Sequence, residues 1–204
     1  MEMRKKYSLL LLAGGKSSRM GQDKAKLLYE GKTFIENLIF KGRELGIEKI
    51  YVSGFSGIQE DIQVVWDIFP DRGPLGGIHA CMKQMETPYC LVVPVDVPQI
   101  PVEVLEELLE FHEKNCEKSM RKKIPVLLEH GERRENLIGI YPVEMVDFIE
   151  DLIREHSAPV YRILKNWGFL CCKMDIAQWK VENINTQEAY QELLSHTAMC
   201  ELEK

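Results

Sequence analysis

The residues whose types and spacing are best suited to chemistry lie in a loop that follows a short apolar run, Leu9 to Ala13. Two adjacent glycines, Gly14 and Gly15, open this loop. Cationic, hydroxyl and carboxylate side chains follow them: Lys16, Ser17, Ser18, Arg19, Asp23, Lys24 and Lys26. Glycine lets a backbone approach an anion closely, and arginine and lysine neutralise the charge of the anion. A buried strand that leads into such a loop predicts a phosphate-binding site.

The spacing within this loop differs from that of the common phosphate-binding loops. A Walker loop has four residues between its first glycine and a Gly-Lys pair, and neither Gly14 nor Gly15 is followed by such a pair. The dinucleotide-binding pattern fails as well, because Lys16 stands where the second glycine of that pattern belongs. We therefore expect a phosphate-binding loop of another type.

Asp96 is the best candidate for a metal ligand. It follows the continuous apolar run Cys90 to Val95 and lies between Pro94 and Pro98. Mg²⁺ typically takes one or two carboxylates and completes its coordination with waters and phosphate oxygens. An aspartate after a strand can instead cap a helix, but the next helix is expected to begin only at Pro101. The sequence therefore predicts a magnesium site at Asp96.

The elements that must position these residues alternate between strand and helix. Strands are expected at 9–13, 49–53, 63–66 and 90–95, and helices at about 34–45, 78–85 and 101–113. Thr33 and Glu36 form a capping box at the start of the first helix. This alternation predicts an α/β fold with a doubly wound, mostly parallel sheet and helices on both faces.

Ligands of such sheets bind beyond the carboxyl ends of the strands. Four positions on separate strands fall there, and we expect them to converge: Gly14, Ser53, Asp67 and Asp96. The remaining chain is less regular, with a hairpin of strands at 124–128 and 137–141, helices at 145–155 and 160–167, and a strand at 169–173. Ser157 is a plausible cap of the second of these helices, and Thr186 caps a last helix.

Composition excludes several classes of protein. The 204 residues carry a net charge of −6, with 45% hydrophobic and 28% charged residues, which is typical of a globular domain and argues against a nonspecific nucleic-acid binder. No segment approaches the roughly 20 apolar residues of a membrane span. The six cysteines include no C-x-x-C pair. We expect a cytoplasmic protein with a single domain, 1–204.

The glycine-rich loop resembles the nucleotidyltransferase signature LAGGxSxRMGxDKxLL. The matching residues are Leu12, Ala13, Gly14, Gly15, Ser17, Arg19, Met20, Gly21, Asp23 and Lys24. Within that superfamily the Ala-Gly-Gly and Asp-Lys forms are most similar to the molybdenum cofactor guanylyltransferases. Later segments resemble motifs of that family in the same order: GPLGG at 73–77, PVDVP around Asp96, and NINT at 183–186, where Gln187 replaces the usual proline. The resemblance covers the chain from about Leu9 to Leu194.

This resemblance implies a Rossmann-like fold that transfers GMP from GTP, with Mg²⁺, to the terminal phosphate of molybdopterin or its molybdenum-bound form. It implies a nucleotide-binding half, about 7–113, and an acceptor-side half with the hairpin, about 114–195. The implied nucleotide-binding residues are Leu12, Ala13, Gly14, Gly15, Lys24, Asp67 and Asp96, and the implied catalytic residues are Lys24, Arg19 and Asp96. Asp71, Asn183 and Asn185 are the implied acceptor-binding residues. Other proteins of molybdenum cofactor biosynthesis, or acceptor enzymes, are further candidate partners.

Two other functions remain open. The first is a cytidylyltransferase for the same pterin, or a nucleotidyltransferase for another phosphorylated small molecule. Sugar and isoprenoid relatives usually read Ala-Ala-Gly where this chain has Ala13-Gly14-Gly15, which argues against them. The second is a non-catalytic module that binds GTP. Lys24 and Asp96 argue against that function, because a sensor needs no charge aimed at a leaving group.

Overall fold

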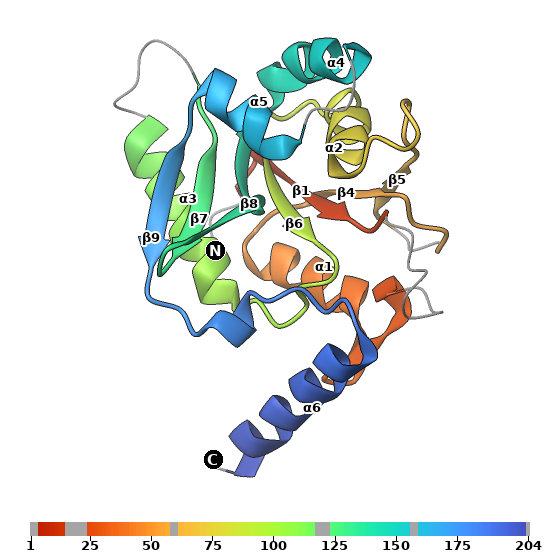
Figure 1. Cartoon of the computed structure of the whole chain (residues 1–204), viewed down its shortest axis with the longest axis vertical. Coiled ribbons are helices and arrows are strands. Elements are labelled where there is room, and N and C mark those ends of the chain that lie inside the picture. Colours follow the sequence, from red (N-terminus) through yellow and green to blue (C-terminus); the bar gives the residue numbers. More distant parts are fainter. Residues whose placement is uncertain (1–3, 15–23, 58–60, 117–122, 156–158, 203–204) are drawn as a thin grey trace.

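A seven-stranded sheet forms the centre of the molecule (Figure 1). The computed structural model describes residues 4–14, 24–57, 61–116, 123–155 and 159–202, with only the backbone for 116 and 197–202. The strands lie in the order β5 (Gln63–Val65), β4 (Lys49–Ser53), β1 (Tyr7–Leu12), β6 (Tyr89–Pro94), β8 (Arg133–Pro142), β7 (Val126–His130) and β9 (Leu170–Met174). All neighbouring pairs among β5, β4, β1 and β6 are parallel, and β8 alone runs antiparallel to its neighbours. The expected mostly parallel α/β sheet is confirmed.

The order of these strands creates a crevice. From β1 the chain goes to β4 and β5 on one side of the sheet and then returns to β6 on the other side of β1. The loops that follow β1 and β6 therefore leave in opposite directions along the sheet edge. An open α/β sheet binds its ligands at such a switch point.

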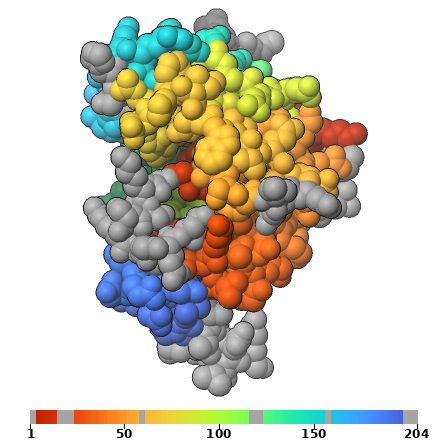
Figure 2. Space-filling view, turned by 90° about the vertical axis from the view of Figure 1, so that its right-hand side faces the viewer, coloured from red at the N-terminus to blue at the C-terminus, as the bar shows by residue number. Residues whose placement is uncertain are grey.

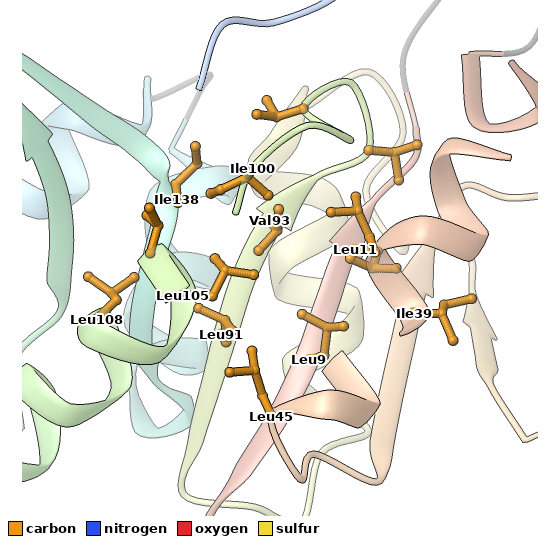
Figure 3. Packing of buried hydrophobic residues seen from close by; sticks show 14 of the residues in the cluster. Leu9, Leu11, Ile39, Leu45, Leu91, Val93, Ile100, Leu105, Leu108 and Ile138 are labelled. Carbon is orange, nitrogen blue, oxygen red and sulfur yellow. The ribbon is translucent and has the colours of Figure 1, made fainter. Parts of the chain in front are cut away.

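Helices cover both faces of the sheet. On one face α1 (Phe34–Glu44) and α3 (Val102–Cys116) pack against alternate residues of the central strands, among them Leu9, Leu11, Leu91 and Val93 (Figure 3). On the other face α2 (Pro74–Met82), α4 (Val146–Arg154) and α5 (Val160–Trp167) pack against residues such as Leu10 and Val92. Both faces of β1 and β6 are therefore buried, which is why their sequences are continuous apolar runs.

The expected hairpin is confirmed, and it belongs to the main sheet. Strands β7 and β8 pair across a turn at Gly131, whose φ of 55° lies in the left-handed region that favours glycine. The far part of β8 pairs with β6, and β7 pairs with β9 on its other side. A separate small hairpin joins β2 (Leu28–Tyr29) and β3 (Lys32–Thr33). The second half of the chain thus extends the sheet past β6.

Short sequence signals predicted where the helices begin, with one exception. The Thr33 capping box is present, since the Thr33 amide donates to Glu36 and the Glu36 amide donates to Thr33 Oγ1. Thr186 Oγ1 accepts a hydrogen bond from the Ala189 amide at the start of α6 (Gln187–Leu202). The exception is α2, which begins at Pro74 and not at the expected 78. Proline suits the first helical position because its missing N–H would be unpaired there. Ser157 lies outside the described residues.

The C-terminal helix α6 extends away from the sheet (Figure 1). Its first turns are attached to the β2–β3 hairpin and α1, because Tyr190 donates a hydrogen bond to the Leu28 carbonyl and packs edge-on against Phe34. Leu193 is buried and belongs to the same hydrophobic cluster as residues of α1 and α3. Within the described part of the chain, no helix combines the length and the apolar composition that crossing a membrane requires.

Candidate functional site

A pocket of about 320 Å³ lies at the carboxyl edge of the parallel strands. Figure 2 shows the yellow surface of the region around α2 and the blue surface of the C-terminal region on this side of the molecule. The residues that line the pocket are Leu12, Ala13, Gly14, Lys24, Ser53, Asp67, Gly73, Pro74, Gly77, Pro94, Val95, Asp96, Leu137, Asn183 and Asn185. The four positions expected to converge, Gly14, Ser53, Asp67 and Asp96, all belong to this lining.

Backbone hydrogen bonds hold the loops at this edge in register. The Ala13 amide donates to the Ser53 carbonyl at 3.1 Å, and the Val95 amide donates to the Leu12 carbonyl at 3.0 Å. Gly54 has a φ of 68°, and a Cβ placed there would lie 2.7 Å from the Cα of Gly14. Only glycine fits at Gly54, so the loops after β1 and β4 are in direct contact.

Lys24 and Asp96 form an ion pair inside the pocket. The distance from Lys24 Nζ to Asp96 Oδ2 is 3.4 Å, and the two side chains are 21% and 18% exposed. Lys24 also donates a hydrogen bond to Asn185 Oδ1. The Ile184 amide donates to the Asp96 carbonyl at 2.7 Å. Three segments that are far apart in the sequence therefore meet around one ammonium group.

Asp96 is not a helix cap, because α3 begins six residues later at Val102. Burial raises the pKa of its carboxyl above the usual value, and the nearby Lys24 ammonium partly opposes this shift. Its second oxygen, Oδ1, is buried and has no hydrogen-bond partner among the described residues. A desolvated carboxylate oxygen without a donor is costly unless a ligand satisfies it.

The donor set around Asp96 fits a hard divalent cation that also binds a phosphate. Among the described residues no three histidine, cysteine or acidic side chains come together as a metal cluster. A cation here would therefore be held by Asp96, by waters and by oxygens of a bound substrate. This is the coordination that Mg²⁺ accepts, since it keeps several waters and binds phosphate oxygens.

Asp67 also lines the pocket and lies two residues after the end of β5. Burial raises the pKa of its carboxyl. The helix α2 approaches closely because it carries two glycines here: a Cβ on Gly76 would lie 2.8 Å from Asp67 Oδ2, and one on Gly77 would lie 2.4 Å from Ser53 Oγ. The glycines at 76 and 77 thus bring the first turn of α2 to the pocket.

The structure brings together most of the predicted site residues. Leu12, Ala13, Gly14, Lys24, Asp67, Asp96, Asn183 and Asn185 all line the pocket. Asp71 is not part of the lining; it lies just before α2 with a φ of 61°. Gly15 and Arg19 lie outside the described residues.

Sequence reasoning missed several lining residues. Leu137 comes from β8 and reaches the pocket only because β8 pairs with β6, for which no short sequence motif exists. Gly73 and Pro74 were recognised as part of a motif, but the early start of α2 that places them in the pocket was not expected. The Gly73-Pro74 pair at the start of α2 was a usable signal, because proline favours the first helical position.

Comparisons with known proteins agree with this geometry. A family model described as a MobA-like NTP transferase domain matches residues 9–169. The chain is similar to a probable molybdenum cofactor guanylyltransferase of Clostridium perfringens, with 33% identity over 202 residues, 93% of this chain and 96% of that protein. It is also similar to a molybdenum cofactor guanylyltransferase of Xanthomonas euvesicatoria, with 33% identity over 133 residues, 63% of this chain and 67% of that protein.

A solved structure shares the fold. The crystal structure of molybdopterin-guanine dinucleotide biosynthesis protein A from Archaeoglobus fulgidus has a TM-score of 0.72 at 20% identity, covering 94% of this chain and 99% of that one. The family model spans most of the chain, including Lys24, Asp67 and Asp96. The chain therefore belongs to the MobA-like NTP transferase family and is a nucleotidyltransferase.

Proposed function

We propose that this nucleotidyltransferase transfers GMP from GTP to the terminal phosphate of molybdopterin and releases pyrophosphate, with Mg²⁺ as its cofactor. The observation that carries the proposal is the pair of Lys24 and Asp96 at 3.4 Å in the pocket between the ends of β1 and β6. The names of the relatives from Clostridium perfringens and Xanthomonas euvesicatoria support the choice of base and acceptor.

The reaction is an in-line displacement at the α-phosphorus of the nucleotide. An oxygen of the acceptor phosphate forms a bond to this phosphorus, and the bond to the bridging oxygen of the β-phosphate breaks. Negative charge grows on the departing pyrophosphate and on the equatorial oxygens. Lys24 supplies a fixed positive charge for these oxygens, and Asn185 orients its ammonium group. Arg19 is proposed to add a second cation.

Asp96 would hold the Mg²⁺, since its buried Oδ1 is free of donors among the described residues. When bound, the cation neutralises phosphate charge and orients the triphosphate. Gly14 and Gly15 are proposed to let the backbone approach the phosphates. The rigid pairing of β1 with β6 keeps Asp96 beside this loop.

Asp67 is proposed to select the nucleoside. An ionised carboxylate offers only hydrogen-bond acceptors, which suits the ribose hydroxyls or the N–H edge of guanine. Asp67 and Asp96 line the same pocket from different strands, which supports a division of roles in which Asp67 binds the nucleoside and Asp96 the phosphates. Asn183 and Asn185 are proposed to contact the acceptor from the C-terminal segment, with Asp71 as a more remote contact.

The test is pyrophosphate release with each of the four nucleoside triphosphates, with and without molybdopterin. We expect release only with GTP, only with the pterin, and only with a divalent cation. Asp96→Asn serves as the inactive control. Release with CTP in preference to GTP would replace the proposal by a cytidylyltransferase. Tight binding of GTP without release of pyrophosphate under any condition would favour a non-catalytic module.

A further inference from the structure

Gln99 connects the loop after Asp96 to the C-terminal part of the site. It is 5% exposed and lies between β6 and α3. Its side-chain nitrogen donates hydrogen bonds to the Trp179 carbonyl at 2.9 Å and to the Glu182 carbonyl at 2.6 Å. Both amide hydrogens are thus used to hold a segment that lies 80 and 83 residues further along the chain.

The side-chain oxygen of Gln99 is less favourably placed than its nitrogen. The Gln99 Oε1 atom is buried without a hydrogen-bond partner among the described residues. An unpaired buried acceptor costs roughly 1–3 kcal/mol. An apolar side chain would avoid this cost, but it would leave the Trp179 and Glu182 carbonyls without this donor. The amide therefore ties the loop after Asp96 to the segment 179–182.

The segment that Gln99 holds leads directly to Asn185. Val181 and Ile184 are buried in the core, and the Ile184 amide bonds to the Asp96 carbonyl at 2.7 Å. The loop 96–99 and the segment 179–184 are therefore joined by three hydrogen bonds. On the other side of the loop, Lys41 Nζ from α1 donates to the Pro98 carbonyl at 2.5 Å. The loop is thus held from two directions.

We propose that Gln99 is a positioning residue, which sets the distance between Asp96 and Asn185 and through Asn185 the position of the Lys24 ammonium. The inference rests on the proposed function, because it assigns Lys24 to stabilise charge in the transfer step. Without the two bonds from Gln99, the hydrogen bond that remains among the described residues between the segment 179–185 and the loop 96–99 is that of the Ile184 amide, beside apolar packing. Asn185 then no longer holds Lys24 in one place.

The test uses Gln99→Met, which is close in size and lacks both donors. In hydrogen–deuterium exchange the Ile184 amide should exchange about tenfold faster or more, whereas the amide of Leu10 in β1 should change only with global stability. The turnover number should fall about tenfold with little change in the KM for GTP, because the lost interaction acts on the transition state. If Gln99→Met keeps both the Ile184 protection and the turnover number, the proposal is wrong.

Thr87→Val is the matched control. Thr87 is also 5% exposed, and its hydroxyl pairs with Ser8 Oγ at 2.6 Å near the start of β1, at the edge of the sheet opposite the pocket. This variant removes the hydrogen bonds of the hydroxyl to Ser8 and to the Tyr89 carbonyl with little change of shape. It should lower Tm but leave the turnover number and the relative exchange of Ile184 unchanged. If Thr87→Val lowers turnover as much as Gln99→Met does, Gln99 has only a structural role.

A double-mutant cycle tests the route through Asn185. If Gln99 acts on Lys24 through Asn185, Gln99→Met should cost little further turnover in an Asn185→Ala background. Full additivity of the two losses would contradict the proposed route.

A second variant serves if Gln99→Met does not fold. Gln99→Asn keeps an amide, but its side chain is one methylene too short to reach both carbonyls. The same outcomes are expected for it. If the wild type does not transfer GMP, the proposed function is wrong. The exchange rate of the Ile184 amide still tests whether Gln99 holds the segment 179–184.

Discussion

The ammonium of Lys24 lies 3.4 Å from a carboxylate oxygen of Asp96, although the two residues are 72 positions apart in the sequence. Without a nucleotide, this ammonium stands beside the carboxylate that is proposed to bind the cation. Two positive charges beside one carboxylate repel each other, so in the absence of a nucleotide Lys24 should weaken the binding of a divalent cation at Asp96.

This repulsion predicts how a cation binds in the absence of nucleotide. Lys24→Ala should bind Mn²⁺, used as a paramagnetic substitute for Mg²⁺, at least several-fold more tightly than the wild type does. The measurement is a titration of free Mn²⁺ by electron paramagnetic resonance, without GTP. Asp96→Asn is the control that should lose the site. Equal Mn²⁺ affinity of Lys24→Ala and the wild type would show that the lysine does not weaken cation binding.

Removal of the Lys24 charge should also slow the transfer step. Lys24→Ala should reduce turnover on the order of a hundredfold or more, because one preorganised charge at the reacting phosphates is lost. The measurement is pyrophosphate release at saturating GTP, with thermal unfolding to show that the variant is folded. Lys26→Ala is a suitable control, since Lys26 is exposed and does not line the pocket. Unchanged turnover of Lys24→Ala would exclude a catalytic role for this lysine.

Asp96→Asn should abolish transfer without loss of stability at pH 7. Burial raises the pKa of this carboxyl in the folded state above its unfolded value. Between those two pKa values the folded state therefore binds more protons than the unfolded state. As pH rises through this range, ionisation of the carboxyl progressively lowers the free energy of unfolding. Asparagine carries no such charge.

Unfolding in denaturant across pH 3 to 7 measures this effect. The stability of Asp96→Asn relative to the wild type should increase as pH rises. A helix-capping aspartate would behave differently, because asparagine caps equally well and both activity and stability would survive. Normal turnover of Asp96→Asn at low Mg²⁺ would therefore contradict the proposed metal site.

Asp67 should govern the choice of nucleotide. With Mg²⁺ present, the wild type should bind GTP at least tenfold more tightly than CTP, and Asp67→Ala should lose much of this preference or bind both weakly. The physical reason is that a carboxylate accepts hydrogen bonds from guanine N–H groups or ribose hydroxyls. Isothermal titration calorimetry with both nucleotides checks this. Tighter binding of CTP by the wild type would overturn the guanylyl assignment.

His112 should make the fold sensitive to acid. Its Nδ1 lies 2.8 Å from the Tyr7 hydroxyl, and burial lowers its pKa from 6.5 to about 4. The unfolded chain therefore binds an extra proton between those values, and stability falls as pH drops from 6.5 to about 4. The full shift corresponds to a loss of up to about 3 kcal/mol, which His112→Asn should largely remove.

Urea unfolding at pH 7 and pH 4.5 measures this loss for both proteins. His196, which is exposed on α6, provides the control variant His196→Asn. That variant should show the same decrease in stability as the wild type. If His112→Asn loses as much stability on acidification as the wild type, the histidine is not the group responsible.

Features that depend on neighbouring residues in the chain followed from the sequence alone. The apolar run of β1, the Thr33–Glu36 capping box and the aspartates beyond β5 and β6 are each encoded within a few residues, because strand burial, capping and loop position have local signatures. The alternation of strands and helices then predicted that Gly14, Ser53, Asp67 and Asp96 meet, since parallel strands end at one edge of a sheet.

Only the tertiary structure decided which side chains touch within that edge. Lys24 meets Asn185 across 161 residues, Gln99 holds the carbonyls of Trp179 and Glu182, and Leu137 enters the pocket from an antiparallel strand. These contacts depend on the insertion of β8 beside β6 and on the return of the C-terminal segment to the Asp96 loop. No local pattern records such an arrangement, because its free energy comes from burial and hydrogen bonds between segments that are neighbours only in the folded chain.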